Sequence, residues 1–253
     1  WYNNRERLDN FKLSEVKMDE LNKKDVIQFY EENAYVWPND NAWHAVNQSE
    51  IHKAVHGLQM PLDAVILNAG SGGSIYGLPH TMHNLDVVSN KNVNLENFTL
   101  GSIENIPFDS QFFDYVICVG SVLNYCDAAK AIQQFSRVLK PQGILLLEFE
   151  SSTSFEFKGT DAYNKNATII TTQYLNSNHD MWVFSPRYIE YLLLANNFTI
   201  KAKRPYHIIS GLAFNRNHDE NVAARYTKYD GIVRRIPVIS KHCGNMIITL
   251  VKN

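Results

Sequence analysis

Charge, cysteine and long apolar runs are all scarce in this chain, and each scarcity argues against a class of protein. The formal net charge is -2 over 253 residues, which gives no general attraction to nucleic acid or to an acidic membrane. Three cysteines (Cys118, Cys126 and Cys243) are few for a disulfide framework and lack metal-ligand spacing. No apolar run approaches the roughly 18 residues of a spanning helix, and no basic-then-apolar leader opens the sequence. We therefore expect a cytoplasmic protein with no membrane partner and with nucleic acid disfavoured as a partner.

The residues that are present favour a sizeable buried core around one central stretch, residues 63–89. It opens with an apolar run, Ala64 to Leu67, whose length suits a buried parallel strand. A glycine-rich turn follows, then a predicted helix from Ser74 to Met82, and then a second apolar run that contains Asp86. Glycines at such a turn let a ligand approach the backbone, and a carboxylate after the next strand can bind both hydroxyls of a ribose. This order of elements predicts a nucleoside cofactor site.

Two cofactor families use this layout, and the glycine spacing separates them. A dinucleotide fingerprint requires G-x-G-x-x-G, but Ile75 stands where the third glycine belongs, which disfavours a nicotinamide-dependent oxidoreductase. The turn instead resembles the G-x-G-x-[GS] motif of class I S-adenosylmethionine-dependent methyltransferases. That resemblance implies S-adenosylmethionine as the cofactor and Asp86 as the ribose ligand. It also implies a cofactor-binding turn composed of Asn68, Ala69, Gly70, Ser71 and Gly72.

Two further segments are similar to the same family. Residues 98–108 resemble its third motif, in which Ser102, Ile103 and Glu104 would surround the adenine; Ser102 replaces the usual aspartate. Residues 120–126 follow a predicted central strand, where the family places Gly120 and Ser121 near the cofactor and Tyr125 near the acceptor. This loop has no proline, unlike that of enzymes that methylate base nitrogens. The Pro-Cys nucleophile of cytosine C5 enzymes is missing as well.

The match continues through F-S-R-V-L-K-P-Q-G-I-L-L-L-E, similar to the family's approach to its fifth strand, with Gln142 replacing a glycine. Asp127 is a good N-cap for the helix before it, and Ser185-Pro186 starts another helix. The resemblance implies an α/β, Rossmann-like, doubly wound sheet of seven strands. It would be mostly parallel, with an antiparallel last strand and helices on both faces. We expect residues 1–62 to form an N-terminal helical lid segment and residues 63–253 to form the methyltransferase core.

Two polar stretches interrupt this core, at about 151–180 and 210–242. Thr168 to Tyr174 is a candidate strand within the first. The second is interpreted as a solvated loop with a short helix, and the alternatives are acceptor recognition or a homodimer contact.

A general base is needed only for an acceptor that is protonated at neutral pH, and histidine is the natural candidate. We favour His44 and His179, which lie in the segments expected near the acceptor. His52 and His56 are four residues apart, but no third ligand supports a metal site, and none is expected.

Together these features predict methyl transfer from S-adenosylmethionine to an oxygen or nitrogen atom of a small-molecule acceptor. A protein or RNA methyltransferase is the alternative within enzymology, and a non-catalytic S-adenosylmethionine-binding module is the alternative outside it. The candidate catalytic residues are His44, His179 and Tyr125.

Overall fold

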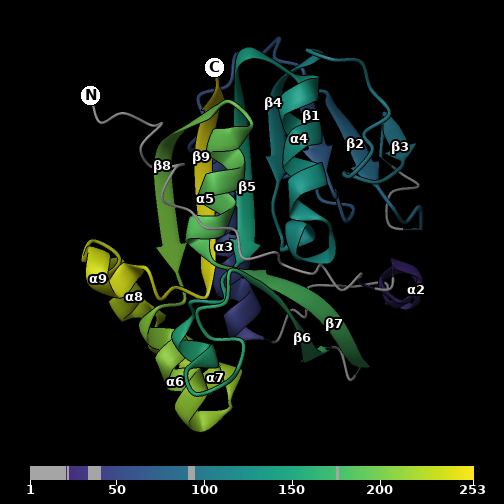
Figure 1. Ribbon diagram of the computed structural model, residues 1–253. Helices are drawn as coiled ribbons and strands as arrows, with labels where there is room; N and C mark the ends of the chain where they lie inside the picture. Colours follow the sequence, from purple (N-terminus) through teal and green to yellow (C-terminus); the bar gives the residue numbers. More distant parts are fainter. Residues whose placement is uncertain (1–20, 22, 34–40, 91–94, 175–176) are drawn as a thin grey trace.

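A seven-stranded sheet in the order β3-β2-β1-β4-β5-β9-β8 forms the centre of the computed structural model, which describes residues 21, 23–33, 41–90, 95–174 and 177–253 (Figure 1). Strands β1 to β5 pair in parallel, whereas β9 is antiparallel to both β5 and β8. This confirms the predicted fold class. The strands are β1 (Ile66–Ala69), β2 (Met82–Asp86), β3 (Phe98–Leu100), β4 (Phe113–Cys118), β5 (Leu139–Glu150), β8 (Phe198–Tyr206) and β9 (Asn245–Lys252).

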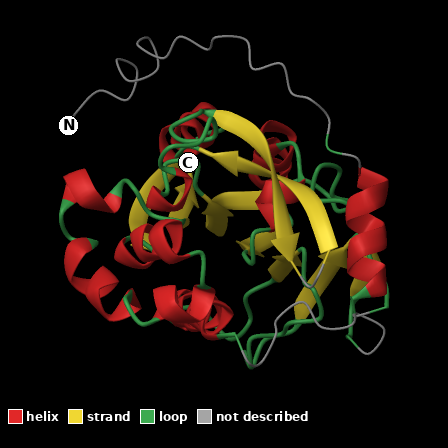
Figure 2. Ribbon diagram, turned by 90° about the horizontal axis from the view of Figure 1, so that it is seen from below, coloured by secondary structure: helices red, strands yellow, loops and turns green. Residues whose placement is uncertain are grey.

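The two faces of the sheet bury alternate side chains in two separate clusters. Leu145 and Leu147 of β5 pack on the face covered by α4 (Ala128–Val138) and α5 (Pro186–Ala195). Leu146, between them, packs on the opposite face with α3 (Ala42–His56). This alternation follows from the two-residue period of a strand, and it explains why residues 144–147 of β5 form an unbroken apolar run. Figure 2 shows the strands in the middle with helices on either side.

Side chains cap three of the helices, and two of these caps, Asp127 and Ser185, lie where the sequence predicts a helix start. Asn41 caps α3 by accepting hydrogen bonds from the backbone N–H groups of the second and third helical residues. Asp127 does the same for α4, and Ser185 caps α5 with a proline at the first helical position. These caps fix the residue at which each helix begins.

The predicted helix from Ser74 to Met82 is wrong. Between β1 and β2 the chain runs through turns, and Met82 is already the first residue of β2. Gly73, Tyr76 and Gly77 have φ values of 82°, 55° and 64°, and this left-handed backbone cannot continue a right-handed helix. The ligand side of the turn therefore has loop backbone where a helix N-terminus was expected.

Strand β5 begins at Leu139 and therefore includes the Lys140–Gly143 turn. Its pairing with β4 shifts register between Phe113 and Tyr115, so the turn is accommodated as an irregularity within the strand. Gln142 has φ 65°, the backbone region that glycine adopts easily, which accounts for the glycine of the family motif at this place.

The two insertions carry more regular structure than the sequence indicates. The first contains a short 3-10 helix, η2 (Phe155–Phe157), and an antiparallel hairpin of β6 (Ala167–Tyr174) and β7 (Ser177–Phe184). The second was interpreted as a solvated loop with a short helix, which is wrong. Four helices occupy it: α6 (Ile209–Asn217), α7 (Glu220–Ala224), α8 (Thr227–Val233) and α9 (Pro237–Ser240).

Within the N-terminal segment the structure describes helix α2 (Lys23–Glu32) and helix α3. The remaining aromatic part of the expected lid, 35–40, lies outside the described residues. In the part of the chain that the structure describes, no helix is long and apolar enough to cross a membrane.

Candidate active site

A cavity of about 810 Å³ opens at the carboxyl edge of the sheet, in the size range of small-ligand pockets. The turns after β1, β2, β3 and β4 line it, as do the last residue of β5 and the first of β9. Helices α2 and α3, the β6–β7 hairpin and α7 supply the rest of the lining. The binding edge expected for an open α/β sheet therefore holds the cavity.

The glycine turn and Asp86 form one hydrogen-bonded unit on the cavity wall. The N–H groups of Gly70 and Ser71 donate to the Leu85 carbonyl at 2.8 and 3.1 Å. The Asp86 carboxylate accepts from the Gly72 N–H at 2.7 Å and, through its other oxygen, from the Val88 N–H at 3.1 Å. A carboxylate offers about four lone-pair directions, so capacity remains for two ligand hydroxyls.

Asn68 and Ala69 belong to the predicted cofactor set but lie behind the cavity wall. Both are buried at the end of β1 and are not among the described lining residues. The Asn68 side chain donates to the Ser74 carbonyl at 2.7 Å and to the Asn84 side chain at 3.0 Å. These bonds close the base of the turn, so Asn68 supports its shape.

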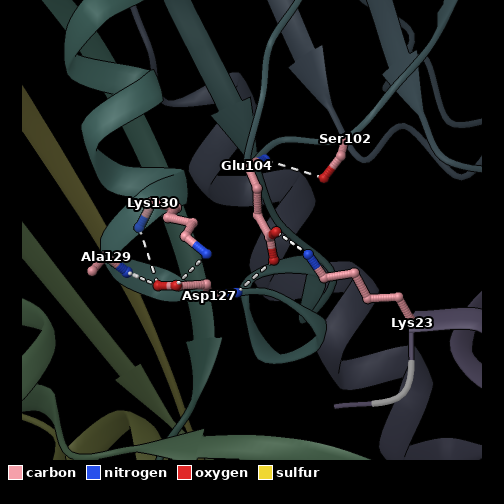
Figure 3. A network of polar contacts seen from close by, with 6 residues as sticks. All are labelled: Lys23, Ser102, Glu104, Asp127, Ala129 and Lys130. Atoms are coloured by element: carbon pink, nitrogen blue, oxygen red, sulfur yellow. Dashed lines mark hydrogen bonds and ion pairs between the residues drawn. The ribbon is translucent and has the colours of Figure 1, made fainter. Parts of the chain in front are cut away.

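Ser102, Ile103 and Glu104 line the cavity after β3, and Glu104 connects three elements (Figure 3). One oxygen of its carboxylate accepts from the Asp127 N–H at 2.7 Å, and the other forms an ion pair with Lys23 of α2. The Glu104 N–H donates to the Ser102 hydroxyl at 3.2 Å. Glu104 thus holds α2 over the cavity at the place where the sequence predicted an adenine contact.

The turn after β4 carries two consecutive left-handed residues, Gly120 at φ 80° and Ser121 at φ 61°. The Ser121 N–H donates to Glu148 at 2.6 Å, and its hydroxyl donates to Glu150 at 2.8 Å. A non-glycine residue in this backbone region costs roughly 1–3 kcal/mol, so it persists where neighbours hold it. Glu148 and Glu150 of β5 hold Ser121 in this conformation.

Two of the three candidate catalytic residues are in direct contact. The Tyr125 hydroxyl and Nε2 of His179 lie 2.8 Å apart, which joins the turn after β4 to β7. The rings of Phe29 and Tyr30 in α2 lie against His179 and Tyr125 at 4.6 and 5.5 Å between centroids. Burial lowers the pKa of His179, so its imidazole is neutral near pH 7.

His44, the third candidate, lines another part of the cavity from the first turn of α3. Burial lowers the pKa of its imidazole, and the charge of Glu220 acts in the opposite direction. The structure therefore places His44 beside α7 and does not bring it into the Tyr125–His179 contact.

Three cavity-lining glutamates were absent from the predicted site: Glu150, Glu156 and Glu220. Burial raises the pKa of Glu150 to about 7 and that of Glu156 to about 8, and the Glu220 charge adds to both shifts. The E-F-E ending of an otherwise apolar strand was a usable signal for Glu150, because charged side chains are rarely placed in a buried strand. Glu156 and Glu220 lie in the insertions, where no motif marks them.

His52 and His56 lie next to each other on helix α3. Their rings stack on the surface of α3 at 4.0 Å between centroids. Across the described ranges, no group of three or more histidine, cysteine or acidic side chains is placed to hold a metal ion.

Comparison with known proteins decides which cofactor-binding family the residues at this edge of the sheet resemble. Residues 63–147 match the family model described as "Methyltransferase domain". This segment is a class I S-adenosylmethionine-dependent methyltransferase domain. A demethylmenaquinone methyltransferase of Staphylococcus epidermidis is 38% identical over 92 residues, which are 35% of this chain and 38% of that protein. The chain thus spans well under half the length of this curated relative.

Solved structures extend the likeness of the methyltransferase fold beyond the matched segment. A protein of Listeria monocytogenes assigned as an S-adenosylmethionine-dependent methyltransferase has a TM-score of 0.58 at 12% identity, covering 81% of this chain and 99% of its own. The 1,6-didemethyltoxoflavin N1-methyltransferase of Burkholderia thailandensis, solved with its acceptor and S-adenosylhomocysteine, has a TM-score of 0.53 at 14% identity. It covers 91% of this chain and 87% of its own. At these identities the likeness shows the fold alone.

The residues present in the methyltransferase domain fit S-adenosylmethionine, the cofactor of this family. Gly72 lines the cavity at φ +52°, and no atom lies within 4 Å of the place where a side chain would begin, so a ligand can reach its backbone. Asp86, beside it, retains acceptor capacity for ribose hydroxyls. Ile103 supplies an apolar wall beyond them.

Proposed function

We propose that the chain transfers a methyl group from S-adenosylmethionine to an oxygen or nitrogen atom of a small-molecule acceptor. The observation that carries this proposal is one cavity with two chemically different walls. The first wall contains Gly72, Asp86 and Ser102 in the matched methyltransferase domain. The second contains side chains from β5, β7 and α7, all outside the matched residues.

The sheet order supports a division of labour between these walls. Strands β1 and β2, which carry the cofactor motifs, are separated by β4 from β5, which ends at Glu150. A cofactor over β1 and β2 would leave space over β4 and β5 for a second molecule. Helix α2 and strand β7 also line the cavity and narrow the space beside the sheet edge, which favours a small acceptor over a macromolecular one.

When bound, S-adenosylmethionine supplies an electrophilic methyl group, so the protein mainly has to position the two reactants. Orientation of this kind can contribute roughly 7–11 kcal/mol to lowering the barrier. We propose that Gly120 and Ser121 shape the cofactor wall, and that the Tyr125–His179 contact and His44 face the acceptor. A neutral His179 could accept a proton from a hydroxyl acceptor.

The acceptor of the curated relative does not transfer to this chain through the matched segment. The name of that relative states that it methylates demethylmenaquinone. The match to the family model ends at residue 147, before Glu150, Glu156, His179 and Glu220. The side chains that would choose an acceptor are therefore this chain's own.

Calorimetric titration with S-adenosylmethionine, S-adenosylhomocysteine and NADH tests the proposal. We expect the first two to bind and NADH not to bind. Asp86→Ala should weaken both by about tenfold or more, because hydrogen bonds to a charged group contribute about 1.5–3 kcal/mol. Asp109→Ala removes an exposed carboxylate away from the cavity and should change neither affinity.

Thermal unfolding of both variants checks that the fold is intact, because Asp86 also bonds the Gly72 and Val88 N–H groups. Binding of NADH, or Asp86→Ala affinities within about twofold of the parent, would refute the proposed cofactor site.

A further inference from the structure

The second wall of the cavity is acidic without a basic partner. Its glutamates Glu150, Glu156 and Glu220 come from the end of β5, from η2 and from α7. No arginine is among the described lining residues, and the two lysines, Lys23 and Lys130, pair with Glu104 and Asp127 beneath α2 and α4. We call these three glutamates the carboxylate wall.

Glu148, two residues before Glu150, shows how this fold satisfies a buried carboxylate that serves structure. It accepts hydrogen bonds from the Ser121 N–H at 2.6 Å, the Asn245 side chain at 2.7 Å and the Tyr206 hydroxyl at 3.2 Å. Glu148 is absent from the described cavity lining. It is fully engaged by the protein.

Glu156 has none of this support. Among the described residues, no hydrogen-bond donor reaches its carboxylate, although protein surrounds it closely enough to raise its pKa to about 8. Its side chain lines the cavity. Glu156 is half-buried, and a carboxylate that accepts no hydrogen bond from the described residues keeps its acceptor capacity for a ligand in the cavity.

Glu150 and Glu220 are only partly engaged. Glu150 lines the cavity, and among the described residues its carboxylate accepts one hydrogen bond, from the Ser121 hydroxyl to Oε1, so Oε2 has no described partner. Glu220 accepts from the Asn41 side chain at the start of α3. The charges of Glu150 and Glu220 both raise the pKa of Glu156, which places the three carboxylates within electrostatic range of one another.

We propose that the methyl acceptor is a small primary or secondary amine, whose ammonium group is bound by the carboxylates of Glu150 and Glu156. This inference rests on the proposed methyltransferase function and names its substrate class. An ammonium group supplies the hydrogen-bond donors that Glu156 lacks and neutralises the carboxylate wall. A carboxylated or phosphorylated acceptor would add like charge to the same wall.

The same carboxylates account for the proton that must leave before transfer. The ammonium N–H passes its proton to Oε2 of Glu150, and the freed lone pair then forms the bond to the methyl carbon. The carbon–sulfur bond breaks, its electron pair stays on sulfur, and the sulfonium becomes a neutral thioether. The pKa of about 7 at Glu150 suits a group that accepts a proton near neutral pH.

The test compares matched amines and alcohols on the protein loaded with S-adenosylhomocysteine. The probes are butylamine with butanol, benzylamine with benzyl alcohol, and phenethylamine with 2-phenylethanol, titrated by calorimetry. We expect at least one amine to bind about tenfold more tightly than its alcohol.

Calorimetric titrations repeated in buffers of different ionisation enthalpy should show that amine binding releases protons. A bound ammonium ion lowers the pKa values of Glu150 and Glu156, which burial raises, and the other charged or titratable side chains that face them are Glu148, Glu220 and His44.

Glu156→Gln should abolish the preference for the amine over the alcohol while leaving the S-adenosylhomocysteine affinity within about twofold. Glu96→Gln makes the same chemical change at an exposed residue outside the described cavity lining and should leave both unchanged. Equal binding of every amine and its alcohol, or an amine preference that survives Glu156→Gln, would overturn the inference. If S-adenosylhomocysteine itself fails to bind the parent, the proposed function fails instead.

Discussion

The two walls of the cavity are built in opposite ways. On the cofactor wall, backbone geometry dominates: Gly70 and Gly72 adopt left-handed conformations, and Asp86 bonds to N–H groups of the chain. On the carboxylate wall, side chains from the insertions dominate, and Glu156 has no described donor. The first wall is held by its own chain, whereas the second is electrostatically unbalanced without a ligand.

The cofactor wall depends on features that the fold provides, whereas the carboxylate wall depends on side chains of this particular chain. A cofactor shared across a family can be bound by main-chain groups, which many sequences provide equally well. An acceptor is recognised by charge and by hydrogen-bond donors or acceptors of specific side chains. Substitutions on the cofactor wall should therefore lower the stability of the fold. Substitutions that remove a charge from the carboxylate wall should raise it.

The largest expected effect is on the cofactor wall, at Gly70. A Cβ atom there would lie 2.4 Å from Cγ1 of Val122, at φ +74°. Gly70→Ala should lower the free energy of unfolding by about 2 kcal/mol or more, through backbone strain and overpacking together. Chemical denaturation measures this change.

Gly72→Ala is the matched control, because φ is +52° but no atom lies within 4 Å of the new Cβ. It should cost about 1 kcal/mol, the strain alone. Adding Val122→Ala to Gly70→Ala should recover part of the loss. Equal losses for Gly70→Ala and Gly72→Ala would show that the close contact with Val122 has no effect on stability.

On the carboxylate wall, a substitution should raise the free energy of unfolding, and the size of the gain should depend on pH. The folded pKa of Glu156 is raised to about 8, so ionisation costs the folded state more than the unfolded state. Its contribution to stability is therefore lost as pH rises from about 4.5 through about 8. Glu156→Gln should be more stable than the parent at pH 8.5 by at least about 1.4 kcal/mol, the value of one pKa unit.

Thermal and chemical unfolding of this variant across that pH range give the measurement. The pKa of Glu150, near Glu156, is also raised by burial, so some pH dependence remains in the variant. Glu96→Gln should follow the parent at every pH. A Glu156→Gln advantage that is constant from pH 5 to pH 8.5 would contradict burial as the source of the shift.

The same contrast explains how much of the molecule could be predicted from sequence. Strand periodicity, helix caps and the family motifs sufficed for the sheet, for α4 and α5, and for the turns after β1 to β4. These features depend on local pattern or on backbone geometry. The helix expected from Ser74 failed because Tyr76 takes a left-handed conformation that no propensity rule assigns to tyrosine.

The carboxylate wall could not be predicted in the same way. Glu156 and Glu220 are separated by a hairpin, two helices and a strand, and only the tertiary structure brings them to one cavity. Charge in a polar insertion normally indicates a solvated surface, so the pattern favoured the wrong interpretation. Glu104 shows a related problem: its place in the motif was correct, but its ion pair with α2 depends on a distant helix.

The smallest expected effect concerns the element that spans both walls, helix α2. Its residues Lys23 and Tyr30 line the cavity, and Lys23 pairs with Glu104 on the cofactor wall (Figure 3). The Lys23 side chain is 62% exposed, so solvent screens the ion pair and its contribution is at most about 1 kcal/mol.

Lys23→Ala should accelerate S-adenosylhomocysteine release by up to about fivefold while leaving unfolding nearly unchanged. Stopped-flow dissociation at low and high salt measures this, and high salt should bring the parent toward the variant. Lys201→Ala, an exposed lysine on β8, is the control. If Lys23→Ala releases the ligand at the parent's rate in low salt, α2 is held over the cavity by its aromatic contacts with Tyr125 and His179 instead.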